Sequence, residues 1–377
     1  ADIPAGFPNE SNTGPTDESS IPATPSDRVV SSFDGQVLEN FHATDVLVYH
    51  DDVTIRNFRV TRDDRDSWFA IALMDHASSG ADVTGTVIEE GEVITRDSGG
   101  NPVPSWGTAV NGSHVTVRRL EISYIENGVQ CRECVIEDNY MHHLLPYANS
   151  HNDGFALTKG ANVTVRRNTI LLPDQQTSAV ILGTYSGPIN NIVIEDNYLN
   201  GGAYTIYSRD NGNGHGAPTN VKVLGNAFGR DSLYGILSSD SPDLVWEDNY
   251  WADTGEFIDD KGHVIGPRVE RCNGLEANVV GTSGSDTLVG TPGPDVIAGL
   301  GGDDVIDGLG GNDVICGHSG RDTLIGGPGN DLIFGGRSRD TVDGGGGADK
   351  IRGGLHADVV RGGAGNDFLL GGTHRDK

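Results

Sequence analysis

Residues 281–334 read GTSGSDTLV, GTPGPDVIA, GLGGDDVID, GLGGNDVIC, GHSGRDTLI and GGPGNDLIF, and this nine-residue unit continues to the last residue, Lys377. The sixth position of the unit is Asp eleven times in succession. Glycines in the first six positions favour tight turns with positive φ, and the last three positions place one apolar residue in a short strand. Units of fixed length bury their apolar residues by stacking on one another, so the pattern predicts a parallel β-roll.

Each turn of the roll offers carbonyl oxygens and an Asp carboxylate, which are the hard ligands that calcium prefers. Stacked carboxylates repel one another without a cation, so we expect calcium binding and folding to be coupled. The units resemble the RTX-type nonapeptide repeat, which implies the same fold and the same ion. The expected calcium ligands are Asp286, Asp295, Asp304, Asp313, Asp322, Asp331, Asp340, Asp349, Asp358 and Asp367.

A second repeat occupies most of the chain before the roll. Four of its units read CVIEDNYM (134–141), VTVRRNTI (163–170), IVIEDNYL (192–199) and VKVLGNAF (221–228), with starting points 29 residues apart. Apolar and polar residues alternate in each unit, which predicts strands of about five residues. A period of this length with several short strands is typical of a right-handed parallel β-helix. These units and the one at 244–251 share Asn at the sixth position, and we expect an internal ladder of Asn139, Asn168, Asn197, Asn226 and Asn249.

The predicted architecture is all-β. An irregular lead-in or cap covers residues 1–27, the parallel β-helix and candidate catalytic domain covers 28–278, and the calcium-binding β-roll covers 279–377. The net charge is −28, with 14 acidic against 8 basic side chains in residues 281–377 and 40 against 18 in the rest. Such acidity argues against nucleic acid and anionic membranes as partners. No run of 18 apolar residues is present, so no membrane span is predicted.

Residues 1–27 lack the basic and apolar regions of a signal peptide, so we interpret Ala1 as a mature terminus left by signal cleavage or as the boundary of a segment. The last unit is incomplete, and we expect the natural chain to continue. We predict a secreted, extracellular monomer. Cys131 and Cys134 favour a disulfide or two free thiols over zinc, because no second pair of ligands accompanies them. Cys272 and Cys316 flank the expected domain junction, and we predict a disulfide that fastens the first repeats to the β-helix.

The two repeat patterns together resemble secreted bacterial β-helix proteins that act on polysaccharides. These include pectate- and alginate-lyase-like enzymes and mannuronan C5-epimerases, the last of which also join a β-helix to RTX repeats. The likeness is one of architecture, because the DPHD-type motif of the epimerases is absent and the nearest string is SHNDGF (150–155). It implies an extracellular polysaccharide as the substrate.

Extending the 29-residue period to the neighbouring strands predicts which residues share a face. It aligns His151 with Val180 and Arg209, Asp153 with Leu182 and Asn211, and Gly154 with Gly183 and Gly212. We predict a groove across these coils with His151, Asp153, Tyr207 and Arg209 as catalytic residues. The expected substrate contacts are Asn149, Asn211, His142, His143 and Lys159, although the last three are equally well explained as turn residues.

The favoured chemistry is β-elimination on a uronic-acid polymer, which needs a base, an acid and a group that neutralises the carboxylate. His151 or Arg209 would be the base and Tyr207 the acid, with Asn149, Asn211 or a calcium ion held by Asp153 as the neutralising group. C5-epimerisation needs nearly the same groups. Glycoside hydrolysis needs two carboxyl groups, and the predicted register turns Asp153 and Asp210 to opposite faces. A polysaccharide-binding adhesin without catalysis is the non-enzymatic alternative.

Overall fold

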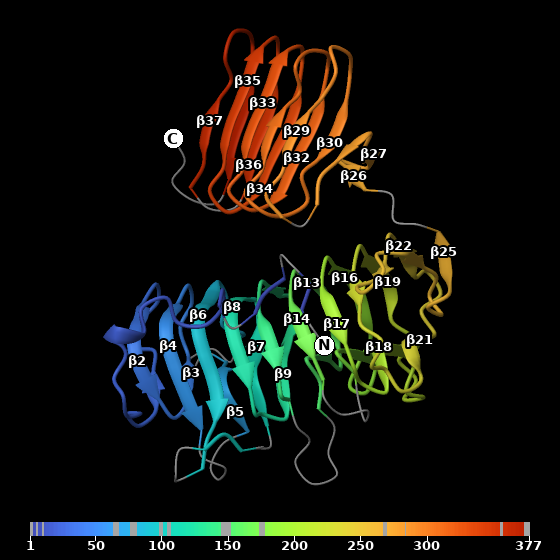
Figure 1. The fold of residues 1–377 in the computed structure, drawn as a ribbon. Coiled ribbons are helices and arrows are strands. Elements are labelled where there is room, and N and C mark those ends of the chain that lie inside the picture. Colours follow the sequence, from blue (N-terminus) through green and yellow to red (C-terminus); the bar gives the residue numbers. More distant parts are fainter. Residues whose placement is uncertain are drawn as a thin grey trace. The chain divides into compact units, whose positions relative to one another are not determined.

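The computed structural model describes residues 3–4, 7–9, 11–62, 68–75, 81–97, 101–103, 107–144, 152–172, 178–266, 270–282, 284–354 and 357–372. The chain divides into two compact units, Ala1–Pro267 and Arg268–Lys377 (Figure 1). Within the described residues the elements are strands apart from one short 3-10 helix, η1 (Glu18–Ser20), so the all-β prediction is confirmed. No helix in these parts of the chain has the length and hydropathy needed to cross a membrane.

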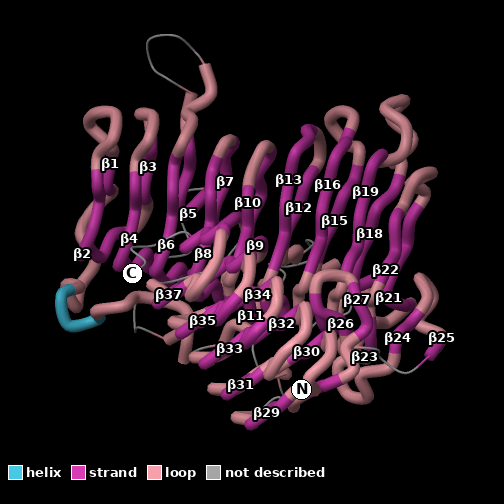
Figure 2. Tube along the Cα trace, turned by 90° about the horizontal axis from the view of Figure 1, so that it is seen from above, coloured by secondary structure: helices cyan, strands magenta, loops and turns pink. Residues whose placement is uncertain are grey.

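The first unit is a parallel β-helix, in which strands of successive coils lie side by side (Figure 2). One face is a nine-stranded sheet over the described residues. Its order is β1 (Val29–Val30), β3 (Val46–Val48), β5 (Phe69–Leu73), β7 (Thr108–Ser113), β9 (Asn127–Arg132), β12 (Phe155–Leu157), β15 (Val180–Gly183), β18 (Tyr204–Arg209) and β21 (Gly235–Ser239).

A sixteen-stranded sheet, again counted over the described residues, forms the rest of the coil wall. In the early coils one long strand extends along two faces of the β-helix. In the later coils two shorter strands take its place, so β8 pairs with both β10 and β11. The strands are β2 (Val37–Ala43), β4 (Thr54–Arg62), β6 (Thr86–Thr95), β8 (Val115–Ser123), β10 (Val135–Glu137), β11 (Tyr140–His142), β13 (Gly160–Arg166), β14 (Thr169–Leu171), β16 (Ile189–Glu195), β17 (Tyr198–Asn200), β19 (Thr219–Leu224), β20 (Ala227–Phe228), β22 (Val245–Glu247), β23 (Tyr250–Trp251), β24 (Phe257–Ile258) and β25 (Val264–Gly266).

The 29-residue period is confirmed on the sixteen-stranded sheet. Ile136 pairs with Val165, Val165 with Ile194, and Ile194 with Val223, and this inward column is fully buried. The asparagine ladder at the corner between β10 and β11 and its equivalents is also present, since each Asn Oδ1 accepts the backbone N–H of the Asn one coil earlier. The residue before each of these asparagines has positive φ, as at Asp138 (58°), which turns the chain at the corner.

The same period is wrong on the nine-stranded sheet. Phe155 pairs with Val180 and Val180 with Ile206, which are offsets of 25 and 26 residues. Consequently Gly183 lies beside Arg209 instead of in a glycine column. The reason is that the connecting segments differ in length from coil to coil. The segment before β12, β15 and β18 shortens from 143–154 to 172–179 and then to 201–203. The segment after the same strands lengthens from 158–159 to 184–188 and then to 210–218. The coil length is kept and the register is not.

The N-terminal lead-in lies along the side of the coils. The Phe7 ring packs 5.8 Å from the ring of Tyr198, and the Gly14 N–H donates to the Arg119 carbonyl at 3.1 Å. Further along, the Asp17 N–H donates to Asn57 Oδ1 at 2.8 Å. These contacts reach from the coil of β17 back to the coil of β4, so the segment covers part of the sixteen-stranded sheet.

The second unit is a β-roll, as predicted. Each coil holds two nine-residue units, so strands pair with the strand 18 residues away and bury columns such as Ile297, Ile315, Ile333 and Ile351. One sheet contains β28 (Val279–Val280), β30 (Val296–Ala298), β32 (Val314–Ser319), β34 (Leu332–Arg337), β36 (Lys350–Gly354) and β38 (Phe368–Gly372). The other contains β29 (Thr287–Val289), β31 (Val305–Asp307), β33 (Thr323–Pro328), β35 (Thr341–Gly346) and β37 (Val359–Arg361).

Both cysteine pairs form disulfides. Cys131 and Cys134 bond to each other across the end of β9, which decides between the two alternatives left open for them. Cys272 and Cys316 also bond, and both lie in the second unit. Their disulfide therefore fastens the hairpin of β26 (Arg271–Cys272) and β27 (Leu275–Glu276) to β32 of the roll, and the expected covalent connection to the β-helix is wrong.

Candidate functional site

The structure brings some of the predicted site residues together on the outward side of the nine-stranded sheet. Asp153 precedes β12, Tyr207 and Arg209 lie on β18, and Asn211 and Lys159 follow β18 and β12. His151 and Asn149 lie outside the described residues. His142 and His143 end β11 on the other sheet, where His142 Nε2 lies 3.1 Å from Glu121 Oε1, so they do not line this face.

Asp153 is the most perturbed acid of this face. Its side chain is 7% exposed, and its Oδ1 accepts a 3.4 Å hydrogen bond from the Ser178 N–H. The pKa of Asp153 is raised to about 7, mainly by burial and also by the charge of Glu126, while the hydrogen bond from Ser178 acts in the opposite direction. The raised pKa favours the protonated carboxyl group near neutral pH, which suits a group that donates a hydrogen bond or transfers a proton.

Two tyrosines and an asparagine form a cluster after β15 and along β18. Tyr207 Oη donates to Asn211 Oδ1 at 3.4 Å, and the buried Asn211 side chain also acts on Tyr185. Burial raises the pKa of Tyr185; the charges of Tyr207 and Asp153 add to the shift, and a hydrogen bond from Asn211 opposes it, which places these groups in one electrostatic cluster.

Gly183 makes room for this cluster. A Cβ at this position would lie 2.4 Å from the Tyr185 ring and 2.6 Å from Asn211 Nδ2, so a side chain here would displace both groups. Tyr185 was not predicted as a site residue, because the 29-residue period placed its coil in the wrong register. The string GTYSG directly after a strand, with an aromatic residue among small ones, was the signal that could have indicated it.

Arg209 remains a cation. Its Nε donates to Asp240 Oδ2 at 3.0 Å, and this hydrogen bond raises the pKa of the guanidinium above its usual value. A general base must be deprotonated to accept a proton, and this hydrogen bond favours the protonated guanidinium, which disfavours the role of base predicted for Arg209. A charged guanidinium in this position is suited to binding an anionic or hydroxyl-rich ligand.

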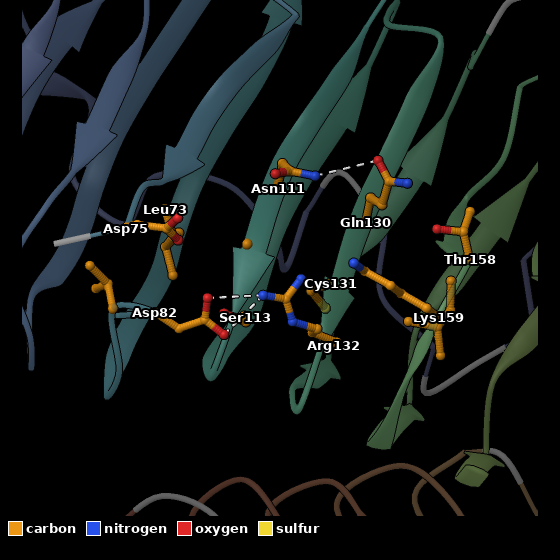
Figure 3. Close-up of a pocket in the computed structure, with 13 residues that line it drawn as sticks. Leu73, Asp75, Asp82, Asn111, Ser113, Gln130, Cys131, Arg132, Thr158 and Lys159 are labelled. Atoms are coloured by element: carbon orange, nitrogen blue, oxygen red, sulfur yellow. Dashed lines mark hydrogen bonds and ion pairs between the residues drawn. The ribbon is translucent and has the colours of Figure 1, made fainter. Parts of the chain in front are cut away.

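A cleft of about 220 Å³ opens on the same sheet over β5, β7, β9 and β12 (Figure 3). Asn111 and Gln130, on adjacent strands, join their amides by a 3.4 Å hydrogen bond. Arg132 donates to both carboxylate oxygens of Asp82 at 2.9 Å, and this contact is the main cause of the lowered pKa of Asp82. Lys159 lines the cleft as an exposed cation, and no ion pair to it is seen among the described residues. The cleft thus offers amides together with two cations, Arg132 and Lys159, and two carboxylates, Asp75 and Asp82.

The strand order gives these groups a sequence along the sheet. The strand that follows Asp153, β12, lies between β9, with Gln130, and β15, with Tyr185 just beyond its end. The register aligns Asn111, Gln130 and Tyr207 across the sheet, level with Ala156 of β12, while Asp153 lies three residues earlier at the start of that strand. Polar groups that follow one another across parallel strands, about 4.8 Å apart, match an extended polymer better than a small molecule.

The roll carries the oxygen atoms that a calcium ion needs. Along each turn column the Asp Oδ1 accepts the backbone N–H of the Asp 18 residues earlier, as in Asp322 from Asp304 at 2.9 Å. The second carboxylate oxygens are buried without a hydrogen-bond partner in Asp304, Asp313, Asp322, Asp331, Asp340 and Asp349. The first glycine of the unit leaves the adjacent space open, since a Cβ on Gly317 would lie 2.4 Å from Asp322 Oδ2.

The pKa values of these aspartates agree with a cation-binding role. Burial is the main cause that raises the pKa of Asp340 to about 8 and those of Asp322 and Asp331 to about 6, and stacked carboxylates add to it. Within the described residues no three His, Cys, Asp or Glu side chains converge on one point. Backbone carbonyls of the turns would therefore complete the coordination, in agreement with the hard oxygen ligands that calcium takes.

Comparison with known proteins supports this assignment. The family model described as the RTX calcium-binding nonapeptide repeat matches residues 280–315, 317–351 and 352–377, and repeats of this family bind calcium. The chain is similar to the solved structure of an alginate lyase from Paenibacillus sp. str. FPU-7, with 11% identity, 92% of this chain and 98% of that chain covered, and a TM-score of 0.29.

The chain is also similar to the catalytic unit of the thermostable GH87 α-1,3-glucanase from Streptomyces thermodiastaticus strain HF3-3. The identity is 13%, the TM-score is 0.26, and the match covers 93% of this chain and 62% of that one. At such TM-scores neither likeness carries an argument about activity. No curated protein sequence matches the chain.

Proposed function

We propose that the first unit is an extracellular polysaccharide lyase that cleaves a uronic-acid polymer by β-elimination, while calcium stabilises the roll. The observation that carries the proposal is Asp153, a buried acid whose pKa is raised to about 7, at the start of β12 within the nine-stranded sheet. A carboxyl group that serves only the fold gains nothing from burial without a cation, because its charged form is penalised.

Each step of the reaction has a candidate group. Protonated Asp153 and the amide Nδ2 of Asn211 would donate to the uronate carboxylate, which makes the neighbouring C5 proton more acidic. A base removes that proton, the C4–O bond breaks, the leaving oxygen takes a proton, and a double bond forms between C4 and C5. Tyr207 is the proposed acid, and His151, two residues before Asp153, is the proposed base.

The cleft would hold the neighbouring sugar. Lys159 provides a positive charge beside the amides of Asn111 and Gln130, which are suited to a carboxylate and to hydroxyl groups. The charges of the cleft lining balance, with Asp75 and Asp82 against Arg132 and Lys159, whereas the chain as a whole is strongly acidic, which disfavours a polyanionic ligand elsewhere on the surface. C5-epimerisation would use the same groups, with the proton returned from the opposite face in place of bond cleavage.

Glycoside hydrolysis is the second candidate, and one observation favours it. The carboxylate of Glu126 acts on Asp153 strongly enough to raise its pKa, so the two carboxyl groups are close in space. Asp210, which the predicted register turned to the opposite face from Asp153, accepts a hydrogen bond from the Gly212 N–H. A protonated Asp153 and a neighbouring Glu126 would provide the acid and the second carboxylate that hydrolysis requires.

Two substitutions test the proposal. D153A and Y207F should each lower the rate of unsaturated-product formation from a uronate polymer by about a hundredfold or more. D27N, an exposed aspartate of the same unit, is the matched control and should retain the wild-type rate. Wild-type rates in both site variants, with normal melting temperatures, would refute the assignment. Loss of binding without any product in the wild type would instead support an adhesin.

A further inference from the structure

Two tyrosines form an exposed aromatic pair at the end of the nine-stranded sheet. Tyr204 begins β18 and lies in register with Gly235, the first residue of β21, directly after Tyr234. The two rings are 5.7 Å apart at their centroids and inclined by 44°, and Tyr234 is 68% exposed. The backbone beneath them is fixed, because the Tyr234 N–H donates to the Ala203 carbonyl at 2.7 Å.

The pair continues the candidate site. The Arg209 guanidinium interacts electrostatically with both Tyr207 and Tyr204, so Tyr204 lies near the cation of the candidate site. Tyr185, in the preceding coil, is 49% exposed. Neither Tyr204 nor Tyr234 belongs to the buried apolar core of the β-helix, so neither ring is needed to fill it. The aromatic rings thus extend the line of polar groups by one further coil beyond Tyr207.

The chemistry of the pair matches a sugar ring. A pyranose presents a face of C–H groups, which gains contact and loses water against the negative face of an aromatic ring, while the tyrosine hydroxyls remain available to sugar hydroxyls. Single exposed aromatic residues need no explanation, but two rings in contact at the end of a polar groove form a surface of the size of one sugar.

We propose that Tyr204 and Tyr234 form a stacking subsite for one sugar ring of a polysaccharide whose chain runs from the Lys159 cleft past Asp153 to the end of the sheet. That the ligand is a sugar of a polysaccharide rests on the proposed function, whereas the geometry of the tyrosine pair is independent of it. Binding on both sides of Asp153 means that the enzyme holds internal segments of the polymer. Removing one ring should weaken polymer binding about three- to tenfold, which is the change in affinity that corresponds to the free energy of one aromatic contact.

Affinity electrophoresis in native gels that contain calcium and one polymer each tests this subsite, with alginate, polygalacturonate, glucuronan and the neutral glucan laminarin as probes. Y234A should weaken the retardation of the protein about three- to tenfold, and Y234F should keep it, because the ring and not the hydroxyl provides the contact. F33A, which removes an aromatic side chain that is 59% exposed before β2, is the matched control and should behave as wild type.

The outcomes separate the subsite from the proposed reaction. Retardation that Y234A weakens, without any cleavage by the wild type, supports the subsite and refutes the lyase. Cleavage with unchanged retardation of Y234A refutes the subsite and leaves the lyase intact. Equal losses in Y234A, Y234F and F33A, or no retardation of the wild type by any probe, would overturn the subsite.

Discussion

Replacing Asp153 with Asn should make the β-helix more stable at neutral and alkaline pH than the wild type. The carboxyl group has a pKa of about 7 in the folded protein, because it is buried beside Glu126. Its ordinary pKa in an unfolded chain is about 3.9. Asn has nearly the same shape and cannot ionise, so D153N retains the packing and loses the penalty of burying a charge.

The size and sign of the effect follow from proton binding. Between about pH 4 and pH 7 the folded state holds a proton that the unfolded state has released, so wild-type stability falls as the pH rises. A shift of about three pKa units corresponds to about 4 kcal/mol. The free energy of unfolding of D153N minus that of the wild type should therefore increase by about 4 kcal/mol from pH 4 to pH 8, with most of the change below pH 7 and a plateau above it.

Urea denaturation of the full chain at fixed calcium concentration and several pH values measures this difference. The transition of the β-helix is the one that EDTA does not move. D27N, at an exposed position, should shift the stability by less than about 0.5 kcal/mol over the same range. E126Q should move the plateau of the wild type to lower pH, because it removes the charge that helps to raise the pKa of Asp153.

A difference between D153N and the wild type that does not vary between pH 4 and pH 8 would refute the reasoning. It would mean that Asp153 ionises in the folded protein as easily as in the unfolded chain. A decrease with rising pH would refute it as well, because it would require a carboxylate stabilised by the fold. The first result would also remove the basis for a proton donor at this position.

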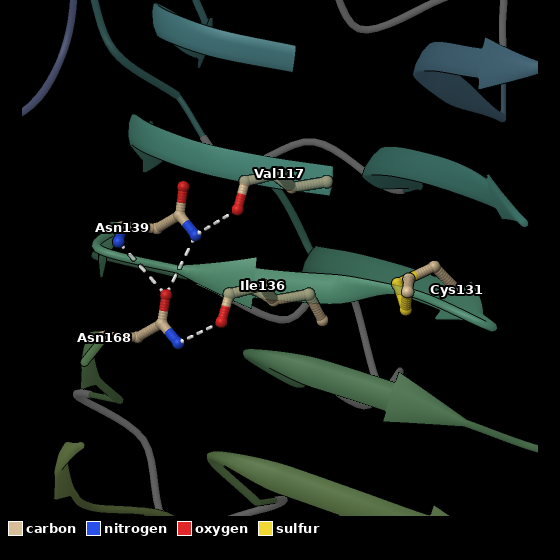
Figure 4. The surroundings of a disulfide bond; sticks show 6 residues. Val117, Cys131, Ile136, Asn139 and Asn168 are labelled. Carbon is tan, nitrogen blue, oxygen red and sulfur yellow. Dashed lines mark hydrogen bonds between the residues drawn. A yellow bond between two sulfur atoms is a disulfide. The ribbon is translucent and has the colours of Figure 1, made fainter. Parts of the chain in front are cut away.

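Three further predictions concern stability and calcium. N168A should lower the free energy of unfolding of the β-helix by about 3 to 5 kcal/mol, because it removes the partner of the Asn139 N–H and of the Ile136 carbonyl (Figure 4) and one donor to Asn197 Oδ1; the exposed D27N should cost less than about 0.5 kcal/mol in the same denaturation experiment. EDTA should lower the melting temperature of the second unit in calorimetry and leave that of the first, and an unchanged thermogram would argue against calcium in the roll. Calcium addition at pH 7 in weak buffer should release protons, since Asp340 has a pKa of about 8 without the ion; D340N should release fewer, and equal release would contradict the role of this side chain.

The repeats show why the two halves differ in how far the sequence predicts them. In the roll every unit has nine residues, so the column of Asp304, Asp322 and Asp340 can be read directly from the spacing. The asparagine ladder is equally regular, because the corner at Asn139 and Asn168 has the same geometry in each coil. Where each coil repeats without insertion, the period alone predicts the neighbours.

The nine-stranded sheet was not predictable in this way. Its corner segments differ in length between coils, and the changes compensate within each 29-residue period, so the repeat gives no sign of the slip. Asp153 and Tyr207 were predicted as site residues from their chemistry. Their neighbours Glu126, Ser178 and Tyr185 were not, because contact between them depends on loop lengths that the spacing of the repeats conceals.

The assay that tests the central claim most directly exposes the calcium-loaded protein to alginate, polygalacturonate and glucuronan and follows the ultraviolet absorbance of unsaturated sugar ends. We predict that the absorbance rises with at least one of these polymers and that D153A abolishes the rise. Reducing sugar released from a neutral glycan, with no absorbance change on any uronate polymer, would contradict the lyase and favour hydrolysis by Asp153 and Glu126.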